Sequence, residues 1–195
     1  MPRRPTTPEQ ITSEALLHKT ARGDGTAFRA LVIRHQNHVF NLAYRILGDR
    51  QRSEDVAQEV FLKVWQTATT FQQKSKFTTW LYRITVNLCL NEIKSQRRWR
   101  WLRLLHVLKT NEVATEHLID QSPTAEELVI AQELNQRITK ALQALPENQR
   151  IALILRRYGG LSYQEISGVL DCSVSAVEAL LVRAKRTVQA FLEKK

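Results

Sequence analysis

The sequence predicts an all-α protein made of two small helical domains joined by a linker, with a helix-turn-helix in the C-terminal domain. Three observations predict this fold class. Glycine and proline are rare, at 6 and 5 of 195 residues. Apolar residues recur at steps of three and four, and two basic regions flank an acidic one. Hydrophobic residues make up 43% of the chain, which is enough to form real cores and excludes a wholly disordered protein.

The charge distribution indicates where the domains meet. Residues 96–110 carry five basic and no acidic side chains, whereas residues 111–133 carry six acidic and no basic ones. The acidic stretch shows little periodicity, so we expect a linker there. The predicted organisation is an N-terminal domain over residues 1–96, a linker over 97–123 and a C-terminal domain over 124–195.

The composition also restricts the partners and the compartment. A net charge of +10 and a pI of about 10.0 favour a polyanionic partner. Cys89 and Cys172 are too far apart for a metal-type spacing, so neither a disulfide framework nor a zinc site is expected. No apolar run reaches the ~20 residues of a membrane span, and no signal-peptide core is present. We expect a cytoplasmic protein without membrane insertion and without a cofactor.

The N-terminal half predicts a series of amphipathic helices. Thr26 caps a helix that ends at Gly48, a residue type suited to the left-handed turn after a helix. Ser53 caps the next helix, and a polar loop follows it. A long helix then opens at Thr78 or its neighbour and runs to about Arg98. It is apolar around most of its circumference, which predicts a central position in the domain.

The C-terminal half contains two capping boxes, at residues 124–127 and 162–165, each pairing a hydroxyl residue with a glutamate three residues later. The first box starts a helix that Pro146 ends, and Pro146 opens another. The second starts a short helix. Asp171 tolerates the left-handed backbone of the turn that follows, and Ser173 caps the final helix.

The apolar spacing of the last two helices predicts a helix-turn-helix. Such a unit needs apolar residues at fixed offsets and a small residue where its helices cross. Ser167 is that small residue, and the inward-facing residues are Ile166, Leu170, Val177 and Leu180. The final helix then lies in a DNA major groove; the alternative is a plain helical hairpin in a protein-binding module.

With these elements in view, the chain resembles the extracytoplasmic-function (ECF) sigma factors of bacterial RNA polymerase over about residues 14–192. The matching blocks follow the family's order. They are ARGDGTAFRAL (21–31), EDVAQEVFLKVW (54–65), FTTWLYRI (77–84), and LPENQR (145–150) with the helix-turn-helix. The resemblance implies an initiation factor whose partners are core RNA polymerase, promoter DNA and an anti-sigma factor.

The second block is similar to the polymerase-binding helix of the family. Its polymerase-binding candidates are Asp55, Gln58, Glu59 and Leu62, on adjacent steps of one helical face. The resemblance implies that this face docks on the coiled-coil clamp helices of the largest polymerase subunit. Without the resemblance, the residues alone favour a solvated face with favourable charge in a first helical turn.

The third block is similar to the family's promoter-melting segment. A protein that holds single-stranded DNA needs cations, aromatic surfaces and amides that pair with an exposed base edge. The minus-ten candidates supply these types, and they are Lys76, Phe77, Trp80, Arg83, Asn87, Asn91 and Lys94. The resemblance implies capture of a flipped base, with Asn87 and Asn91 in matching places. For Trp80, a place in the core is an equal alternative.

The final helix is similar to the helix that reads the minus-thirty-five element. The candidates on its outer side are Ser173, Ser175, Glu178, Ala179, Val182, Arg183, Lys185 and Arg186. Many relatives have arginine or serine where this chain has Glu178, Ala179 and Leu180. Glutamate accepts from a cytosine amino group and alanine touches a thymine methyl. Leu180 is explained as core, and we expect a different minus-thirty-five sequence from that of arginine-rich relatives.

Three features fall outside these blocks. The Trp- and Arg-rich stretch 96–109 continues the long helix along DNA backbone, lies on a membrane surface, or packs on an inhibitory partner or the second domain. His35 and His38 are three apart on a helix, but no carboxylate or thiol accompanies them, so no metal site is expected. No paired carboxylates or nucleophile–base set is found, so no catalytic residue is expected.

The main alternative to a dissociable initiation subunit is a stand-alone helix-turn-helix regulator with an N-terminal sensing domain. The two functions differ in their need for polymerase. A sigma factor binds promoters specifically only as part of the holoenzyme, whereas a regulator binds its sites alone.

Overall fold

The computed structural model describes residues 11–72, 75–110 and 137–193, and no strand occurs within these ranges. The N-terminal helices are α1 (Ser13–Thr20), α2 (Gly25–Leu47), α3 (Arg50–Thr67), the 3-10 turn η2 (Ala68–Thr70) and α4 (Phe77–Thr110). Residues 137–143 are helical. They precede α6 (Glu147–Arg157), α7 (Tyr163–Leu170) and α8 (Val174–Glu193). The all-α prediction is confirmed, while the capping box at 124–127 lies outside the described residues.

Two predicted N-caps are wrong, and a nearby aspartate takes each role. Asp24 caps α2 by accepting the amide N–H of Thr26 at 2.9 Å. Asp49 caps α3 by accepting the amide N–H of Arg52 at 2.9 Å. Ser53 is instead buried inside α3, where its hydroxyl donates to the Asp49 carbonyl. Carboxylates and hydroxyls are near-equivalent caps, so the sequence left several candidates at each helix start.

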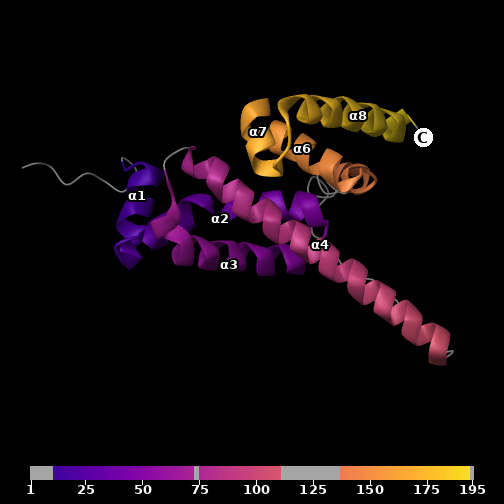
Figure 1. The fold of residues 1–195 in the computed structure, drawn as a ribbon, viewed down its shortest axis with the longest axis horizontal. Helices are drawn as coiled ribbons and strands as arrows, with labels where there is room; N and C mark the ends of the chain where they lie inside the picture. The colour runs from indigo at the N-terminus through magenta and orange to yellow at the C-terminus, as the bar shows by residue number, and fades with distance from the viewer. Residues whose placement is uncertain (1–10, 73–74, 111–136, 194–195) are drawn as a thin grey trace, which may run out of the picture.

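The long helix α4 is the axis of the molecule, and it differs from its prediction at both ends. It begins at Phe77 and continues past the expected end near Arg98 to Thr110. Its first part lies between α2 and α3 on one side and α7 on the other, whereas its last turns project away from all other helices (Figure 1). We call residues 77–96 the covered half of α4 and residues 97–110 its projecting half.

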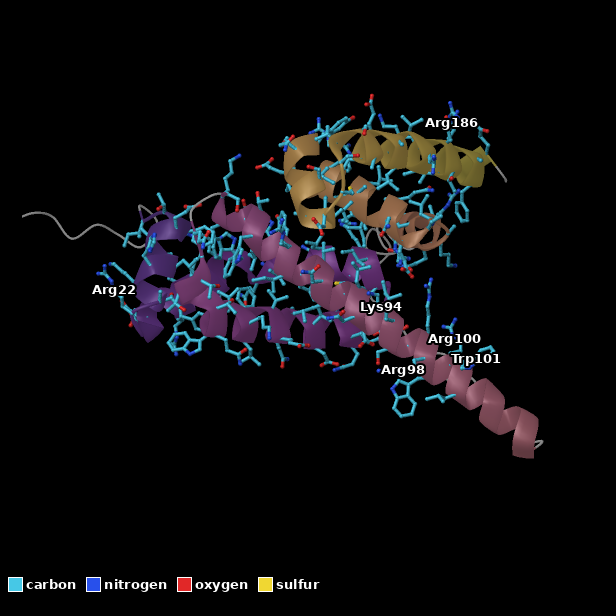
Figure 2. All side chains as sticks on the ribbon, viewed as in Figure 1. Arg22, Lys94, Arg98, Arg100, Trp101 and Arg186 are labelled. Carbon is cyan, nitrogen blue, oxygen red and sulfur yellow. The ribbon has the colours of Figure 1, made fainter. Side chains whose placement is uncertain are left out.

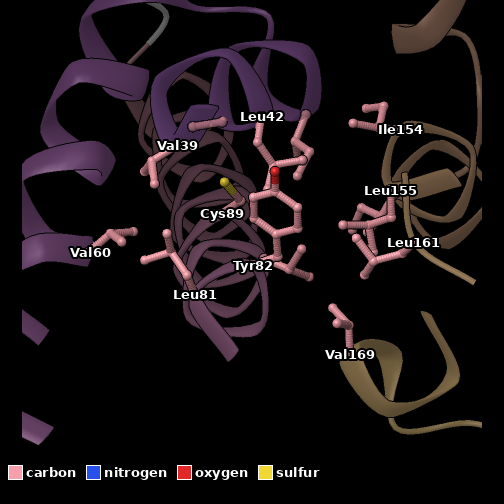
Figure 3. Close-up of a cluster of buried hydrophobic side chains, with 14 of the residues drawn as sticks. Val39, Leu42, Val60, Leu81, Tyr82, Cys89, Ile154, Leu155, Leu161 and Val169 are labelled. Carbon is pink, nitrogen blue, oxygen red and sulfur yellow. The ribbon is translucent and has the colours of Figure 1, made fainter. Parts of the chain in front are cut away.

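One continuous core joins the two halves of the chain. Leu81 and Cys89 of α4 are fully buried, and the cluster that contains them extends to Leu155 and Leu161 of the C-terminal domain. Tyr82, which is 8% exposed, faces these residues across the contact (Figure 3). The covered half of α4 therefore belongs to the packing of both domains.

Two glycines allow the domains to approach closely. Gly48 ends α2 with a φ of 74°, and a Cβ there would lie 2.8 Å from the amide nitrogen of Gln143. That amide donates to the Ile46 carbonyl at the end of α2 over 3.1 Å. At Gly159, a Cβ would lie 3.1 Å from the ring of Tyr82. A side chain at Gly48 would displace the Gln143 amide, and one at Gly159 would clash first with the Leu155 carbonyl oxygen, 2.7 Å away.

Polar contacts surround this apolar seam. The Arg45 guanidinium lies 3.8 Å from the centroid of the Tyr158 ring, and Arg97 pairs with Glu147 at 2.6 Å. Arg150 is 6% exposed, and its burial lowers the pKa of the guanidinium. Each of these contacts involves a side chain of the C-terminal domain.

Candidate nucleic-acid interface

The predicted polar stripe exists on the surface of α4. It consists of Trp80, Arg83, Asn87, Asn91 and Lys94. Arg83, Asn87 and the two residues that follow in the stripe are exposed, and Trp80 is half-buried. Side chains three and four residues apart lie on one helical face. The helix therefore presents cations and amides in a single row, with an aromatic ring at its start.

The aromatic end of the stripe is built partly into the core. Phe77 is 0% exposed, and its ring lies 5.0 Å from that of His35. Trp80 stands at the edge of this group, with its ring centroid 5.3 Å from Phe71 and 6.0 Å from Phe77. Phe77 therefore does not share the exposed surface with the other minus-ten candidates. Trp80 combines the two alternatives, since one side of the ring packs on Phe71 while part of it remains accessible.

A cavity of about 380 Å³ lies where the stripe meets α7. Its lining residues are Ser75, Lys76, Thr79, Trp80, Arg83, Gln164, Glu165 and Gly168. Lys76 pairs with Glu165 over 3.4 Å, and the Thr79 hydroxyl donates to the same carboxylate over 3.3 Å. Arg83 Nε donates to the carbonyl of Gly168 at 2.9 Å. Two cations expected at the minus-ten element thus contact the other domain.

Glu165 and Gly168 were not predicted as site residues, and no single-sequence signal reveals them, because their partners lie in the other domain. Glu165 also closes the capping box of α7, accepting the amide N–H of Ser162 at 2.8 Å. This backbone hydrogen bond, the Ser162 hydroxyl and the charge of Lys76 lower the pKa of Glu165. The carboxylate is therefore held ionised beside the stripe.

The helix-turn-helix has the geometry that the sequence predicted. Asp171 is left-handed, with φ and ψ both 52°, and the Ser173 hydroxyl accepts the amide N–H of Ala176 at 3.1 Å. Ser167 is buried at the crossing. The capping box of α7 is also present. The turn is therefore fixed by hydrogen bonds between residues that are close in sequence.

The inward register of α8 differs in one position from the prediction. Val177, Leu181 and Ala184 are buried, at steps of four and three. Leu180, expected in the core, is only partly buried, as is Leu170 of α7. A helical turn of 3.6 residues allows either neighbour to point inward, and here Leu181 is the buried one.

The outer face of α8 is accessible. Its exposed candidates are Ser173, Ser175, Glu178, Val182, Arg183, Lys185 and Arg186, and Ala179 is half-buried. Hydroxyl, carboxylate and methyl groups precede the basic residues along the helix. In chemical type, the groups at the N-terminal end of α8 suit base edges and the cations behind them suit phosphates.

The face predicted for polymerase binding lies on α3, away from the contact with the C-terminal domain. Asp55, Gln58, Glu59 and Leu62 are all exposed. Leu62 is 62% exposed, which is unusual for a leucine on a packed helix. Because α3 begins at Arg50, these carboxylates do not lie in its first turn. Helix-dipole stabilisation therefore does not account for this row of exposed carboxylates.

The remaining candidates for chemistry are structural. His35 is buried, and its ring nitrogen lies 2.9 Å from the Ser13 hydroxyl. Burial raises the pKa of Cys89 to about 12, so its thiol is not a nucleophile. Among the described residues, no three metal-ligating side chains gather. No helix in the described ranges is long and apolar enough to cross a membrane.

Comparisons with known proteins agree with this geometry. The family model for sigma-70 region 2 matches residues 31–99, and that for sigma-70 region 4 matches residues 135–188. The ECF RNA polymerase sigma-E factor of Escherichia coli K12 is 34% identical over 182 residues, covering 92% of this chain and 94% of that protein. The RNA polymerase sigma-H factor of Pseudomonas aeruginosa PAO1 is 32% identical over 184 residues, covering 94% and 95%.

Solved structures have the same fold. CnrH, in complex with the cytosolic domain of CnrY, matches with a TM-score of 0.67 and 24% identity, covering 93% of this chain and 97% of that one. The sigma factor RpoE of Bartonella quintana, in complex with the anti-sigma factor NepR, matches with a TM-score of 0.63 and 24% identity, covering 86% and 98%. Proteins of this kind are generally non-enzymatic. The chain belongs to the ECF sigma factors of RNA polymerase and is a promoter-directing transcription initiation factor.

Proposed function

We propose that this sigma factor uses three separate surfaces in initiation. The exposed face of α3 binds core RNA polymerase, the polar stripe of α4 binds the minus-ten element, and the outer face of α8 reads the minus-thirty-five element. The single observation that carries the proposal is the row of exposed cations and amides along α4. The corresponding units are an N-terminal domain over residues 1–96, a linker over 97–123 and a C-terminal domain over 124–195.

The minus-ten contact is a base-capture site. Arg83 and Lys94 hold the backbone, while the amides of Asn87 and Asn91 pair with the edges of an unstacked base. Unstacking costs a few kcal/mol per base, which contacts in the site must offset. Binding energy supplies this cost, so the opening step requires no nucleotide hydrolysis. Phe77 is buried, so it packs behind the site and is no longer proposed as a DNA contact.

Promoter binding requires the two domains to separate. The two elements lie about 25 base pairs apart, or about 85 Å at 3.4 Å per base pair. In this structure Arg83 is bonded to Gly168, and Ser173 follows five residues later. An extended chain of that length spans at most about 18 Å. A duplex with a persistence length of about 150 base pairs does not fold back over this distance cheaply.

The contacts of Lys76, Thr79 and Arg83 with α7 are therefore those of a closed state of the free chain. We infer that engagement of polymerase and promoter releases them. In the free protein, Arg83 of the stripe and the neighbouring Lys76 are already paired with the other domain. This predicts weak binding of the minus-ten element by the chain alone, as expected for a subunit that acts as part of a holoenzyme.

We also propose an anti-sigma partner and a cytoplasmic location. CnrH and RpoE were each solved with a partner, the cytosolic domain of CnrY and the anti-sigma factor NepR. The exposed Leu62 on α3 offers an apolar contact that such a partner can cover in competition with polymerase. The stand-alone regulator is not favoured, because both sigma regions are present in one chain.

Run-off transcription with purified chain and core polymerase on a library of promoters tests the function. The expected result is RNA that starts at defined sites, with specific footprints only when polymerase is present. The variant Glu59→Lys reverses one charge of the α3 face and should lower polymerase binding. The matched variant Glu193→Lys, at the exposed end of α8, should not. Specific footprints by the chain alone, with no RNA from any promoter, would establish the regulator instead.

Glu178 tests the assignment of α8 to base reading. Replacing Glu178 with Ala removes the acceptor expected to face a cytosine amino group, which is worth about 1–3 kcal/mol of discrimination. We expect altered base preference at one position and little change in overall affinity, measured by selection from a randomised minus-thirty-five region. A uniform loss of affinity across sequences would mean that Glu178 does not read a base.

A further inference from the structure

Within the projecting half of α4, Arg97 pairs with Glu147 of the C-terminal domain, but the exposed residues after it have no structural explanation in either domain. All six residues from Arg97 to Leu102 are exposed. Trp99 and Trp101 are 65% and 64% exposed, and Leu102 is 49% exposed. Figure 2 shows the labelled side chains of Lys94, Arg98, Arg100 and Trp101 on the part of α4 that leaves the rest of the molecule. A helical segment that exposes two tryptophans to solvent indicates a surface for a partner.

This surface is in register with the polar stripe. From Trp80, steps of three and four reach Lys94, then Arg98, then Trp101. These residues share one helical face, and the row from Trp80 to Trp101 is about 32 Å long at 1.5 Å per residue. The face that holds unpaired bases in the covered half thus continues without a break into the projecting half.

The chemistry of the extension selects a polyanion rather than a membrane or an apolar groove. Residues 96–110 carry five basic and no acidic side chains. A membrane-surface helix needs one apolar face set apart from its charged face. Here Trp99 and Trp101 are two residues apart, on nearly opposite sides of α4, with Arg100 between them. No separate apolar face exists on the described part of this segment.

We propose that Lys94, Arg98 and Trp101 bind the phosphate backbone of the duplex that borders the opened minus-ten segment. This inference rests on the proposed function of the stripe. The stretch from Asn91 to Trp101 is about 15 Å long, which matches about four base pairs at 3.4 Å each. The contact carries no base readout, because cations on phosphate position a protein without reading sequence. It also remains accessible in the closed state, since Lys94, Arg98 and Trp101 are exposed and the helix projects away from α7 and α8 beyond Arg97 (Figure 1).

The first test uses the full chain without polymerase, so it does not depend on transcription. Binding to a 30-base-pair duplex is measured by fluorescence anisotropy between 50 and 200 mM salt. The slope of log K against log salt is negative, and each lost phosphate contact makes it less steep by about 0.9. The slope of the double variant Lys94→Ala, Arg98→Ala should therefore be less steep by about 1.8. Between these salt concentrations, the wild type should lose about tenfold more affinity than the variant.

Arg100 provides the matched control, because it has the same charge and exposure but lies on the other side of the helix. Arg100→Ala should leave the slope within experimental error of the wild type. Trp101→Ala should weaken duplex binding equally on unrelated sequences. Equal slopes for the double variant and the wild type would overturn the proposal, as would binding of the wild type to vesicles of anionic phospholipid but not to the duplex.

A second measurement distinguishes failure of this inference from failure of the proposed function. Holoenzyme is assembled with the wild type or the double variant, and run-off RNA is measured at 50 and 200 mM salt. If the proposal holds, the variant loses less activity with rising salt than the wild type. If the wild type yields RNA and the variant shows an unchanged salt dependence, the extension has no such role. Absence of RNA from the wild type would refute the proposed function, while the anisotropy result still decides the duplex contact.

Discussion

The two halves of α4 have similar helical backbones and very different surroundings. In the covered half, Leu81, Val86 and Cys89 are fully buried, and Arg83 bonds to the other domain. In the projecting half, every residue with a described side chain is exposed. The face of the polar stripe in the covered half continues through Arg98 and Trp101 of the projecting half without a change of register. The comparison teaches that the second domain limits access to only part of a continuous surface, and that the remaining part is available in the free chain.

The largest expected difference between the two halves is the loss of stability when one side chain in each is truncated. Leu81→Ala removes a fully buried side chain from the core shared by both domains, and should lower the free energy of unfolding by about 2–5 kcal/mol. Trp101→Ala, in the projecting half, should change it by less than about 0.5 kcal/mol. Urea denaturation followed by circular dichroism measures both. Similar losses would mean that the projecting half also packs on something.

The stability of the core beside the start of α4, where His35 is buried, should depend on pH. Burial, followed by the positive charges of His38 and Arg34, lowers the pKa of His35 from 6.5 to about 4. The unfolded chain therefore binds more protons than the folded chain between pH 6.5 and pH 4. The contribution of neutral His35 to the free energy of unfolding is fully present above pH 6.5. It is lost as the pH falls toward 4, by about 3 kcal/mol. Denaturation curves from pH 7 to pH 4 measure this loss.

His35→Gln is the control for that experiment, since glutamine is neutral throughout and still offers a hydrogen bond to Ser13. Its stability should fall less over the same range, by the share that His35 contributes. A variant as pH-sensitive as the wild type would assign the effect to other groups. Glu14, whose pKa is lowered chiefly by a hydrogen bond from the Phe77 amide, is the first to examine.

The smallest expected effect comes from removing the ion pair between Lys76 and Glu165, which joins the start of α4 to the C-terminal domain. Glu165→Gln keeps a capping-box side chain but removes the ion pair with Lys76. Exposed ion pairs contribute about 0.2–1 kcal/mol. The free chain should therefore bind a single-stranded minus-ten oligonucleotide more tightly, by less than about fivefold. Glu193→Gln, at the end of α8 where the carboxylate accepts a hydrogen bond from Gln189, should have no effect. Weaker binding by Glu165→Gln would contradict the closed-state interpretation.

Most helices, the helix-turn-helix and the exposed functional faces could be predicted from the sequence, because each depends on local periodicity or a local cap. Asp171 and the box at 162–165 are examples, since their hydrogen bonds join residues within one turn. The caps at Asp24 and Asp49 were missed because neighbouring hydroxyls offered an equivalent local solution. Leu180 was placed in the core because adjacent positions on a helix satisfy the same pattern.

The contacts between domains could not be predicted. Arg83 and Gly168 lie 85 residues apart, and nothing in either segment indicates its partner. Phe77 was assigned to DNA because an aromatic residue at a helix start suits a base or a core equally, and only packing against His35 decides between them. The end of α4 was placed too early near Arg98, although no glycine or proline occurs in residues 97–110 to stop the helix.

Energy transfer between the two domains tests the central claim most directly. Fluorophores on Gln66→Cys of α3 and Gln189→Cys of α8, both exposed positions, are introduced with Cys172→Ser, since Cys89 is buried. We expect the transfer efficiency of the free chain to change by a large amount when core polymerase and promoter DNA are bound, because the two domains separate. An unchanged efficiency in a complex that is synthesising RNA would contradict it.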